Sequence, residues 1–151
     1  MPLDIPLKQE MIEILPGLLK DFDLHVIEDQ YLPESFGNSD VTLQSPKVLV
    51  RFVRDRGHVW AEVAPVTATT GWWPLGFVLQ AIHGQLPEIQ FGLSPAVRLL
   101  RDNFCELADA LGPRLTETRG DIERLREERL QAMTDRGREA ARRIRETSGN
   151  S

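Results

Sequence analysis

The sequence predicts an α+β fold: an antiparallel β-meander of about four strands, packed with N-terminal and C-terminal helices and followed by a long charged C-terminal helix. A chain of 151 residues with 41% hydrophobic and 27% charged side chains has the size and composition of one globular domain. Apolar and polar residues alternate near the middle of the chain, and apolar residues recur at helical spacing on both sides of that region. We therefore expect a globular domain at residues 1–112, a charged helical extension at 113–147 and a disordered tail at 148–151.

The first elements are helical and then extended. Residues 7–22 carry apolar side chains at helical spacing and are interrupted by Pro16, which predicts one kinked helix or two short ones. Residues 23–29 and 41–45 alternate apolar and polar side chains on either side of the turn-rich segment "PESFGNSD". These two segments are predicted to form strands joined by a loop.

The stretch "VRFVRDRGHVWAEVAP", residues 50–65, predicts a β-hairpin. With Gly57 in a left-handed conformation, "DRG" suits a three-residue loop that ends in a glycine bulge. This register pairs Phe52 with Trp60 and makes one face of the hairpin nearly all aliphatic, so that face is predicted to be core. The core face then holds Leu49, Val53, Val59, Ala61 and Val63, and the opposite face holds Val48, Val50, Phe52 and Trp60.

Two more helices are predicted before the charged extension. Apolar residues at helical spacing follow Pro74, which suits a first helical position, and Gly84 supplies a stop. The next helix is predicted to begin with Ser94 as its N-cap and Pro95 in its first turn, and its apolar stripe ends at Gly112.

The extension is predicted to be a helix over residues 116–147 with few apolar side chains. Leu130, Gly137 and Ile144 approximate the heptad spacing that is typical of a coiled coil. Such a helix gains little from burial, so it either projects into solvent or packs on a neighbour. A homo-oligomer formed through residues 116–147 is one role that this pattern predicts.

The uneven distribution of charge bears on the kind of partner. The net charge is −5, but residues 1–112 hold eight Lys/Arg against fifteen Asp/Glu, whereas residues 113–151 hold ten against eight. An acidic globular domain argues against nucleic-acid binding and favours a basic protein partner. The longest apolar run, residues 71–82, is too short to cross a bilayer, and the N-terminus lacks the basic start of a secretory signal. We expect a cytoplasmic protein with no membrane association.

Sequence motifs for catalysis are absent, because the chain has no glycine-rich phosphate loop, nucleophile elbow or metal-binding spacing of His and Cys. No catalytic residue, cofactor or metal is therefore predicted. His25, His58 and His83 would form a site around Asp55 only if the fold gathers them. The lone Cys105 is predicted to be a buried, inert thiol.

Trp72 and Trp73 allow two interpretations. Two large rings at the start of a helix over a sheet fit a cover for the core, with one of the rings exposed. The same rings would also serve as a stacking platform in a ligand pocket.

A partner-binding surface is predicted on the second face of the hairpin. An aromatic centre with charged side chains around it is typical of protein interfaces. The alternative is that the N-terminal helix or the tail helix covers this face. The predicted surface consists of Phe52, Trp60, Glu62, Asp55, Arg54 and His58.

Two turn motifs, Phe36-Gly37-Asn38-Ser39 and Asp55-Arg56-Gly57, carry a family resemblance. With them, residues 22–82 resemble a bacterial group of small, mostly uncharacterised proteins, similar to the immunity proteins and accessory domains that accompany bacterial toxins. The resemblance implies a non-enzymatic protein-interaction domain whose partner is a basic toxin or another protein, and it brings no catalytic residues. Two alternatives stay open: a small ligand-binding or hydrolytic enzyme domain with a His/Trp pocket, and an oligomeric scaffold formed through the C-terminal helix.

Overall fold

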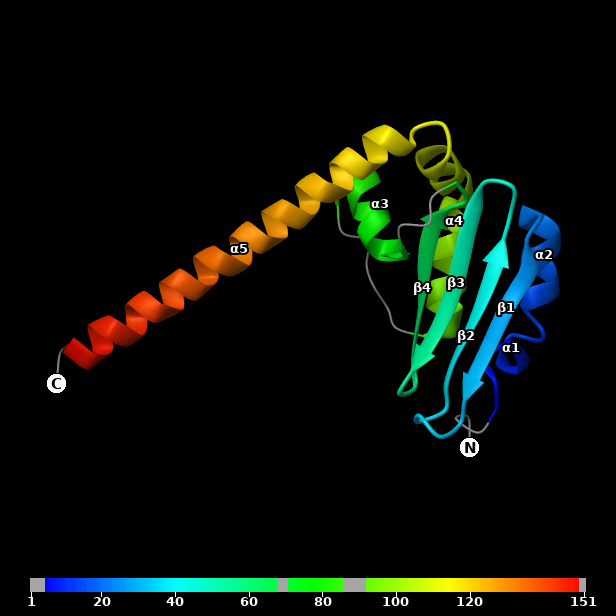
Figure 1. Ribbon diagram of the computed structural model, residues 1–151, viewed down its shortest axis with the longest axis horizontal. Helices are drawn as coiled ribbons and strands as arrows, with labels where there is room; N and C mark the ends of the chain where they lie inside the picture. Colours follow the sequence, from blue (N-terminus) through cyan, green and yellow to red (C-terminus); the bar gives the residue numbers. More distant parts are fainter. Residues whose placement is uncertain (1–4, 68–70, 86–91, 150–151) are drawn as a thin grey trace.

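A computed structural model describes residues 5–67, 71–85 and 92–149. It shows the predicted α+β class: a five-stranded antiparallel sheet in which the order of the strands in space is their order along the chain (Figure 1). The predicted four-strand meander is confirmed, and a two-residue fifth strand is added at its edge. The strands are β1 (His25–Leu32), β2 (Asn38–Gln44), β3 (Val48–Asp55), β4 (His58–Pro65) and β5 (Trp73–Pro74).

Helices pack on one face of the sheet. Within the chain, α1 contacts β2, and α4 contacts β3 and β4; in Figure 1, α4 lies behind the sheet and no helix lies in front of it. A hydrophobic core fills the space between this face and the helices. The helices are α1 (Leu7–Glu10), α2 (Leu15–Phe22), α3 (Leu75–His83), α4 (Leu93–Leu111) and α5 (Leu115–Gly149).

The β3–β4 hairpin has a two-residue loop, so the predicted three-residue loop is wrong. Asp55 pairs directly with His58, and both loop residues, Arg56 and Gly57, have positive φ, which is typical of a type I′ turn. The left-handed Arg56 is held from outside the hairpin, because its N–H donates a hydrogen bond to the side-chain oxygen of Asn38. That contact joins two turns and cannot be inferred from the hairpin sequence alone.

The change of register moves every side chain of β3 to the face opposite to the one predicted. Phe52 pairs with Ala61, and Val53 pairs with Trp60. As a result Phe52 is fully buried against the helices, whereas Val53 is only partly buried on the other face. Val59, Ala61 and Val63 are core as predicted; Leu49 and Val53 are not, and their places are taken by Val48, Val50 and Phe52.

Arg54 continues the buried row of β3 and brings a charge into the core. Its side chain is only 3% exposed, and its Nη1 donates to a carboxylate oxygen of Glu10 at 2.8 Å. Its Nη2 donates to the main-chain oxygen of Gly37 at 2.9 Å and also to that of Ile5. Because Nε, Nη1 and Nη2 of this guanidinium each donate to an acceptor, the buried charge is compensated.

The helix boundaries follow the predicted breaks with two differences. Residues 7–22 form two short helices, but Pro16 lies in the first turn of α2 and the break precedes it. Gly84 ends α3 in a left-handed conformation, as predicted. Helix α4 already begins at Leu93, so its N-cap is Gly92 and the predicted capping role of Ser94 is wrong. Residues 86–91, between α3 and α4, are not among the described residues.

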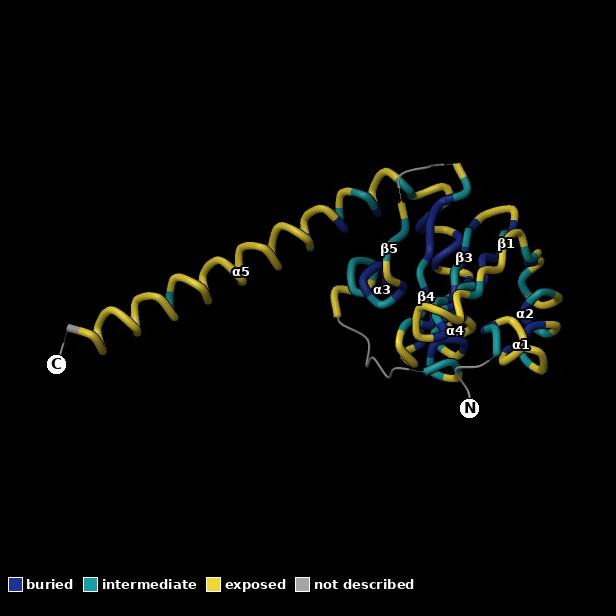
Figure 2. Tube along the Cα trace, turned by 60° about the horizontal axis from the view of Figure 1, so that its bottom comes forward, coloured by how far each residue is buried: buried dark blue, intermediate teal, exposed yellow. Residues whose placement is uncertain are grey.

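Helix α5 is continuous and leaves the body of the protein after its first turns (Figure 1). Ile122 is buried against the core, but beyond Arg129 nearly all of the helix is exposed, as Figure 2 shows. The helix continues through Ser148 and Gly149, where a disordered tail was expected to begin. Leu130, Met133 and Ile144 are each more than half exposed, so assembly through this helix stays a prediction. None of the helices in the described segments is long and apolar enough to cross a membrane.

Candidate functional site

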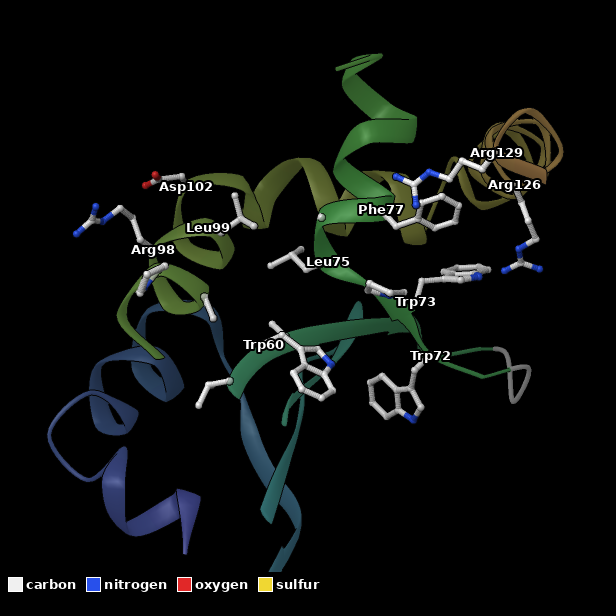
Figure 3. A pocket seen from close by; sticks show the side chains of 16 residues that line it. Trp60, Trp72, Trp73, Leu75, Phe77, Arg98, Leu99, Asp102, Arg126 and Arg129 are labelled. Carbon is white, nitrogen blue, oxygen red and sulfur yellow. The ribbon is translucent and has the colours of Figure 1, made fainter. Parts of the chain in front are cut away.

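A groove of about 670 Å³ lies beside β4, between the sheet and helices α3, α4 and α5 (Figure 3). This volume is within the usual range for small-molecule sites. We call it the tryptophan groove. Its apolar lining includes Trp60, Trp72, Trp73, Leu75, Phe77 and Leu99, and its charged lining consists of Arg98, Asp102, Arg126 and Arg129.

The groove forms because β5 is short. Strand β5 pairs only Trp73 with Val63 and Pro74 with Glu62, and helix α3 starts immediately afterwards. Proline has no N–H group, so it cannot extend the ladder, and its fixed φ suits the turn into the helix. The first half of β4, which contains Trp60, therefore has no β5 residue beside it, and α3 and α4 form the walls there.

Trp72 is held on the sheet by a cation. The guanidinium carbon of Arg51 lies 4.5 Å from the centroid of the Trp72 ring, and Arg51 Nη2 lies 2.6 Å from Glu62 Oε1. Figure 3 shows the ring of Trp72, which directly precedes β5, on the same side of β4 as the ring of Trp60. Trp73, in contrast, packs against the hydrophobic core. Both tryptophans are partly exposed and line the groove, and Trp73 also contributes to the cover of the core.

Helix α5 supplies the charged end of the groove. Arg126 and Arg129 lie on the helix face that also carries the buried Ile122, because residues spaced three and four apart share a face. Arg129 is held by Phe77, whose ring centroid is 4.4 Å from its guanidinium carbon, and by a hydrogen bond to the side-chain oxygen of Gln80. In Figure 3 both arginines reach from α5 towards Phe77 and Trp73.

The opposite wall of the groove carries one cation and one anion, both from α4. Arg98 and Asp102 are four residues apart on this helix and line the groove. A smaller cavity of about 310 Å³ adjoins the α5 side and is lined by Trp72, Arg119 and Glu123, among others. The groove itself therefore contains three guanidinium groups and one carboxylate, although the globular domain as a whole is acidic.

The sheet face turned away from the core carries charged side chains around Trp60. We call it the open face, and its central residues are partly exposed. Asp40, Val53 and Trp60 follow one another across β2, β3 and β4, and Arg51 pairs with Glu62 in the next row. The open face is defined by Asp40, Leu49, Arg51, Val53, Trp60 and Glu62.

Burial raises the pKa of Asp40 above its ordinary value of 3.8. The guanidinium of Arg51 acts in the opposite direction, and the carboxylates of Glu28, Glu62 and Asp29 raise the pKa further. The open face thus has a net negative charge, because Asp40 and Glu62 lie beside a single arginine. A cation brought to this face would be stabilised by them.

Asp40→Asn should increase the stability of the protein at neutral pH. Because its folded-state pKa is raised, Asp40 binds a proton more tightly in the folded protein, and its contribution to stability is lost as pH rises through that pKa. Asparagine imitates the protonated form, so the gain should be present at pH 7 and should vanish below the ordinary value of 3.8. Urea unfolding at pH 7 and at pH 3 measures the free energy of unfolding of wild type and variant at each pH. Glu34→Gln, at an exposed carboxylate, is the control. A loss of stability at pH 7 would contradict the prediction.

The structure divides the six residues of the predicted partner-binding surface. Trp60 and Glu62 lie on the open face as expected, and the paired Asp55 and His58 lie at its end, next to the turn. Helix α4 contacts β3, and Glu10 of α1 binds Arg54, so the alternative of a face covered by helices of the same chain is correct for the side of β3 that carries Phe52. Phe52 and Arg54 are buried, and their assignment to a surface is wrong.

The groove residues on α3 and α5 were not predicted from the sequence. The spacing of Arg119, Ile122, Arg126 and Arg129 does reveal a helix face that combines basic residues with one core residue. It does not reveal that this face meets Phe77, which is 49 residues earlier than Arg126. Tertiary packing alone brings the two together.

The three histidines lie on three different elements, β1, β4 and α3. His25 lies 3.6 Å from Asp23, His58 pairs with Asp55 across the hairpin, and His83 is hydrogen-bonded to Glu106. None of the three lines the groove, and the described residues contain no group of three His, Cys, Asp or Glu placed to hold a metal ion. The predicted His/Trp pocket therefore has no histidine in it. Cys105 is exposed on α4, which corrects its predicted burial.

The two turn motifs that carry the family resemblance contact each other. Gly37 accepts a hydrogen bond from Arg54, Asn38 accepts one from Arg56, and the Arg56 guanidinium carbon lies 5.2 Å from the centroid of the Phe36 ring. These residues brace the β1–β2 and β3–β4 turns against each other. Their conformations are explained by structure, so they do not by themselves indicate a function.

No protein-family model, curated protein or solved structure matches the chain.

Proposed function

We propose that this chain is a non-enzymatic protein-interaction domain of the immunity type, which binds a basic partner on its open face with Trp60 at the centre. One observation carries the proposal: the face of the sheet opposite the core exposes a tryptophan beside Val53 and is flanked by the carboxylates of Asp40 and Glu62. Binding at such a surface would bury the indole ring while charges of opposite sign approach around it.

The open face has a physical means of selecting a basic partner. Arg51 shows that a guanidinium is accommodated beside an indole and a carboxylate here, since it stacks on Trp72 and binds Glu62. An arginine or lysine of a partner would make the same two kinds of contact at Trp60 and Asp40. The negative charge of residues 1–112 would speed the encounter, and the effect would weaken as salt is added.

An immunity-type role requires occlusion of a partner rather than catalysis. The open face supplies a broad surface, and the helices on the other side of the sheet keep it rigid. The weak likeness of the two turn motifs to toxin-associated proteins agrees with this role, although the motifs themselves are structural.

Trp60→Ala should weaken binding of the partner by about tenfold or more, because a buried aromatic anchor carries much of the energy of an interface. The candidate partner is the product of the neighbouring gene, and titration calorimetry of the two purified proteins measures the affinity. Ile27→Ala is the control, since Ile27 is 53% exposed on the edge strand β1, away from Trp60. Circular dichroism should show that both variants keep the fold.

Two results would count against this function. Equal affinity of wild type and Trp60→Ala would remove Trp60 from the interface. Failure of the neighbouring product to bind the wild-type protein would remove the immunity-type assignment.

A further inference from the structure

We propose that the tryptophan groove binds a small anionic ligand with a planar apolar body. The body would lie against the apolar side chains that line the groove, and the anionic group would be bound by Arg126 and Arg129 of α5. The proposal goes beyond a protein-interaction role, because it concerns a separate cavity with the opposite charge.

The size and walls of the groove suit a compact organic molecule. Its volume of about 670 Å³ lies within the range of small-molecule sites, and three tryptophans contribute to its lining. Indole faces bind planar rings better than flexible chains, because offset or edge-to-face contacts add to the burial of apolar surface. Leu75 and Leu99 complete the apolar part from α3 and α4, as Figure 3 shows.

The α5 end of the groove selects a negative charge. Arg126 and Arg129 are three residues apart on one helix face, so their guanidinium groups serve the same part of the groove. Arg129 is positioned in advance by Phe77 and Gln80, and in the described part of the chain Arg126 makes no salt bridge that would compete with a ligand. Guanidinium pairs bind carboxylate, sulfonate and phosphate groups through charge-assisted hydrogen bonds.

The carboxylates near the groove do not cancel these cations. Asp102 lies on α4, on the wall opposite α5, and it shares that wall with Arg98. Glu123 lines the adjoining cavity together with Arg119. Each carboxylate is therefore matched by an additional arginine of the same cavity, and Arg126 and Arg129 remain in excess.

Charge also separates this site from the open face. The groove is lined by three arginines and one carboxylate, whereas the open face carries two carboxylates and one arginine. A cation attracted to the open face would be repelled at the α5 end of the groove. An anion would be attracted to the groove and repelled by the open face. Both sites include Trp60, so the test below uses groove residues that do not lie on the open face.

Two fluorescent probes that share one apolar body provide the test. 8-Anilinonaphthalene-1-sulfonate carries a sulfonate, and N-phenyl-1-naphthylamine is the same ring system without it. We expect the wild-type protein to bind the anionic probe saturably at one site, with quenching of tryptophan fluorescence, and to bind the neutral probe more weakly. The affinity for the anionic probe should fall as salt is added, and that for the neutral probe should not.

Arginine variants then identify the anionic end. Arg126→Gln/Arg129→Gln should lower the affinity for the anionic probe by about tenfold and leave that for the neutral probe within about twofold. Arg126→Lys/Arg129→Lys should retain much of the affinity, because the charge remains. Arg124→Gln is the matched control, since Arg124 lies on the same helix but pairs with Asp121 and does not line the groove. Leu99→Trp should weaken binding of both probes by filling the apolar part.

Several outcomes would overturn the proposal. They are the lack of saturable binding of the anionic probe, an equal loss for both probes in Arg126→Gln/Arg129→Gln, an equal effect of Arg124→Gln, or unchanged binding in Leu99→Trp. If the double glutamine variant does not fold, the proposal is tested by the affinity of Arg126→Gln alone for the two probes and by the salt titration of the wild-type protein.

Discussion

Replacing Phe52 with alanine should destabilise the protein by about 3 to 5 kcal/mol, the usual cost of deleting a large buried side chain and leaving a cavity. Phe52 is fully buried on the core face of β3, where it pairs with Ala61 across the hairpin. A loss of this size is a large share of the stability of an ordinary domain, so the variant should unfold at much lower urea concentration or temperature. Urea unfolding followed by circular dichroism measures the change.

Trp60→Ala is the matched control for this experiment. Both residues are aromatic and lie near the centre of the same hairpin, but Trp60 is only partly buried, on the opposite face. Its replacement should therefore cost much less than that of Phe52. The reverse order of the two effects would mean that the hairpin has the other register, in which Phe52 faces solvent, and would remove the open face as described.

Arg54→Met should cost about 2 to 3 kcal/mol, because it removes a buried cation and leaves its acceptors without donors. The carboxylate of Glu10 loses its partner, and the main-chain oxygens of Gly37 and Ile5 lose their hydrogen bonds. Glu10 is itself about one-third exposed, at 34%, so water can solvate part of its charge and the cost stays below that of a fully buried pair. Thermal and urea unfolding at neutral pH measure the loss.

Two further variants test whether the loss of stability in Arg54→Met comes from the buried ion pair. Arg56→Met changes the neighbouring arginine of the hairpin, which is 73% exposed, and should cost much less than Arg54→Met because it loses only a solvent-exposed contact with Phe36. Arg54→Met/Glu10→Met removes both partners and should recover part of the loss, because no charged group is then left unpaired. If Arg54→Met costs no more than Arg56→Met, the buried guanidinium does not support the contact between α1 and the hairpin.

Phe52 and Arg54 connect the stability of the domain to its proposed sites. Arg54 ties α1 to β3, and Phe52 fills the core below the same strand. Because side chains alternate, holding these residues inward directs Val53 and Arg51 outward, beside Trp60 and Trp72. The geometry of the open face therefore depends on residues that no partner would touch.

The helices and strands could be predicted from local pattern. Helical spacing of apolar residues located α3 and α4, Gly84 ended α3 as expected, and period-two alternation located β3 and β4. These features depend on neighbouring residues, which is why the sequence contains them. The alternation of β3 is almost symmetrical, with Val48, Val50 and Phe52 on one face and Leu49 and Val53 on the other, so hydrophobicity did not decide which face is buried.

By itself, the sequence determined the α+β class, the order of the elements, the acidic character of the globular domain and the presence of tryptophans near the start of α3. Only the tertiary structure decided the register of the hairpin, because a hydrogen bond from Arg56 to Asn38 of another turn stabilises the two-residue loop. It also decided the groove, whose aromatic walls and arginines come from segments far apart in the chain. Packing between distant segments depends on complementary shape and charge in three dimensions, and the order of residues within any one segment does not record it.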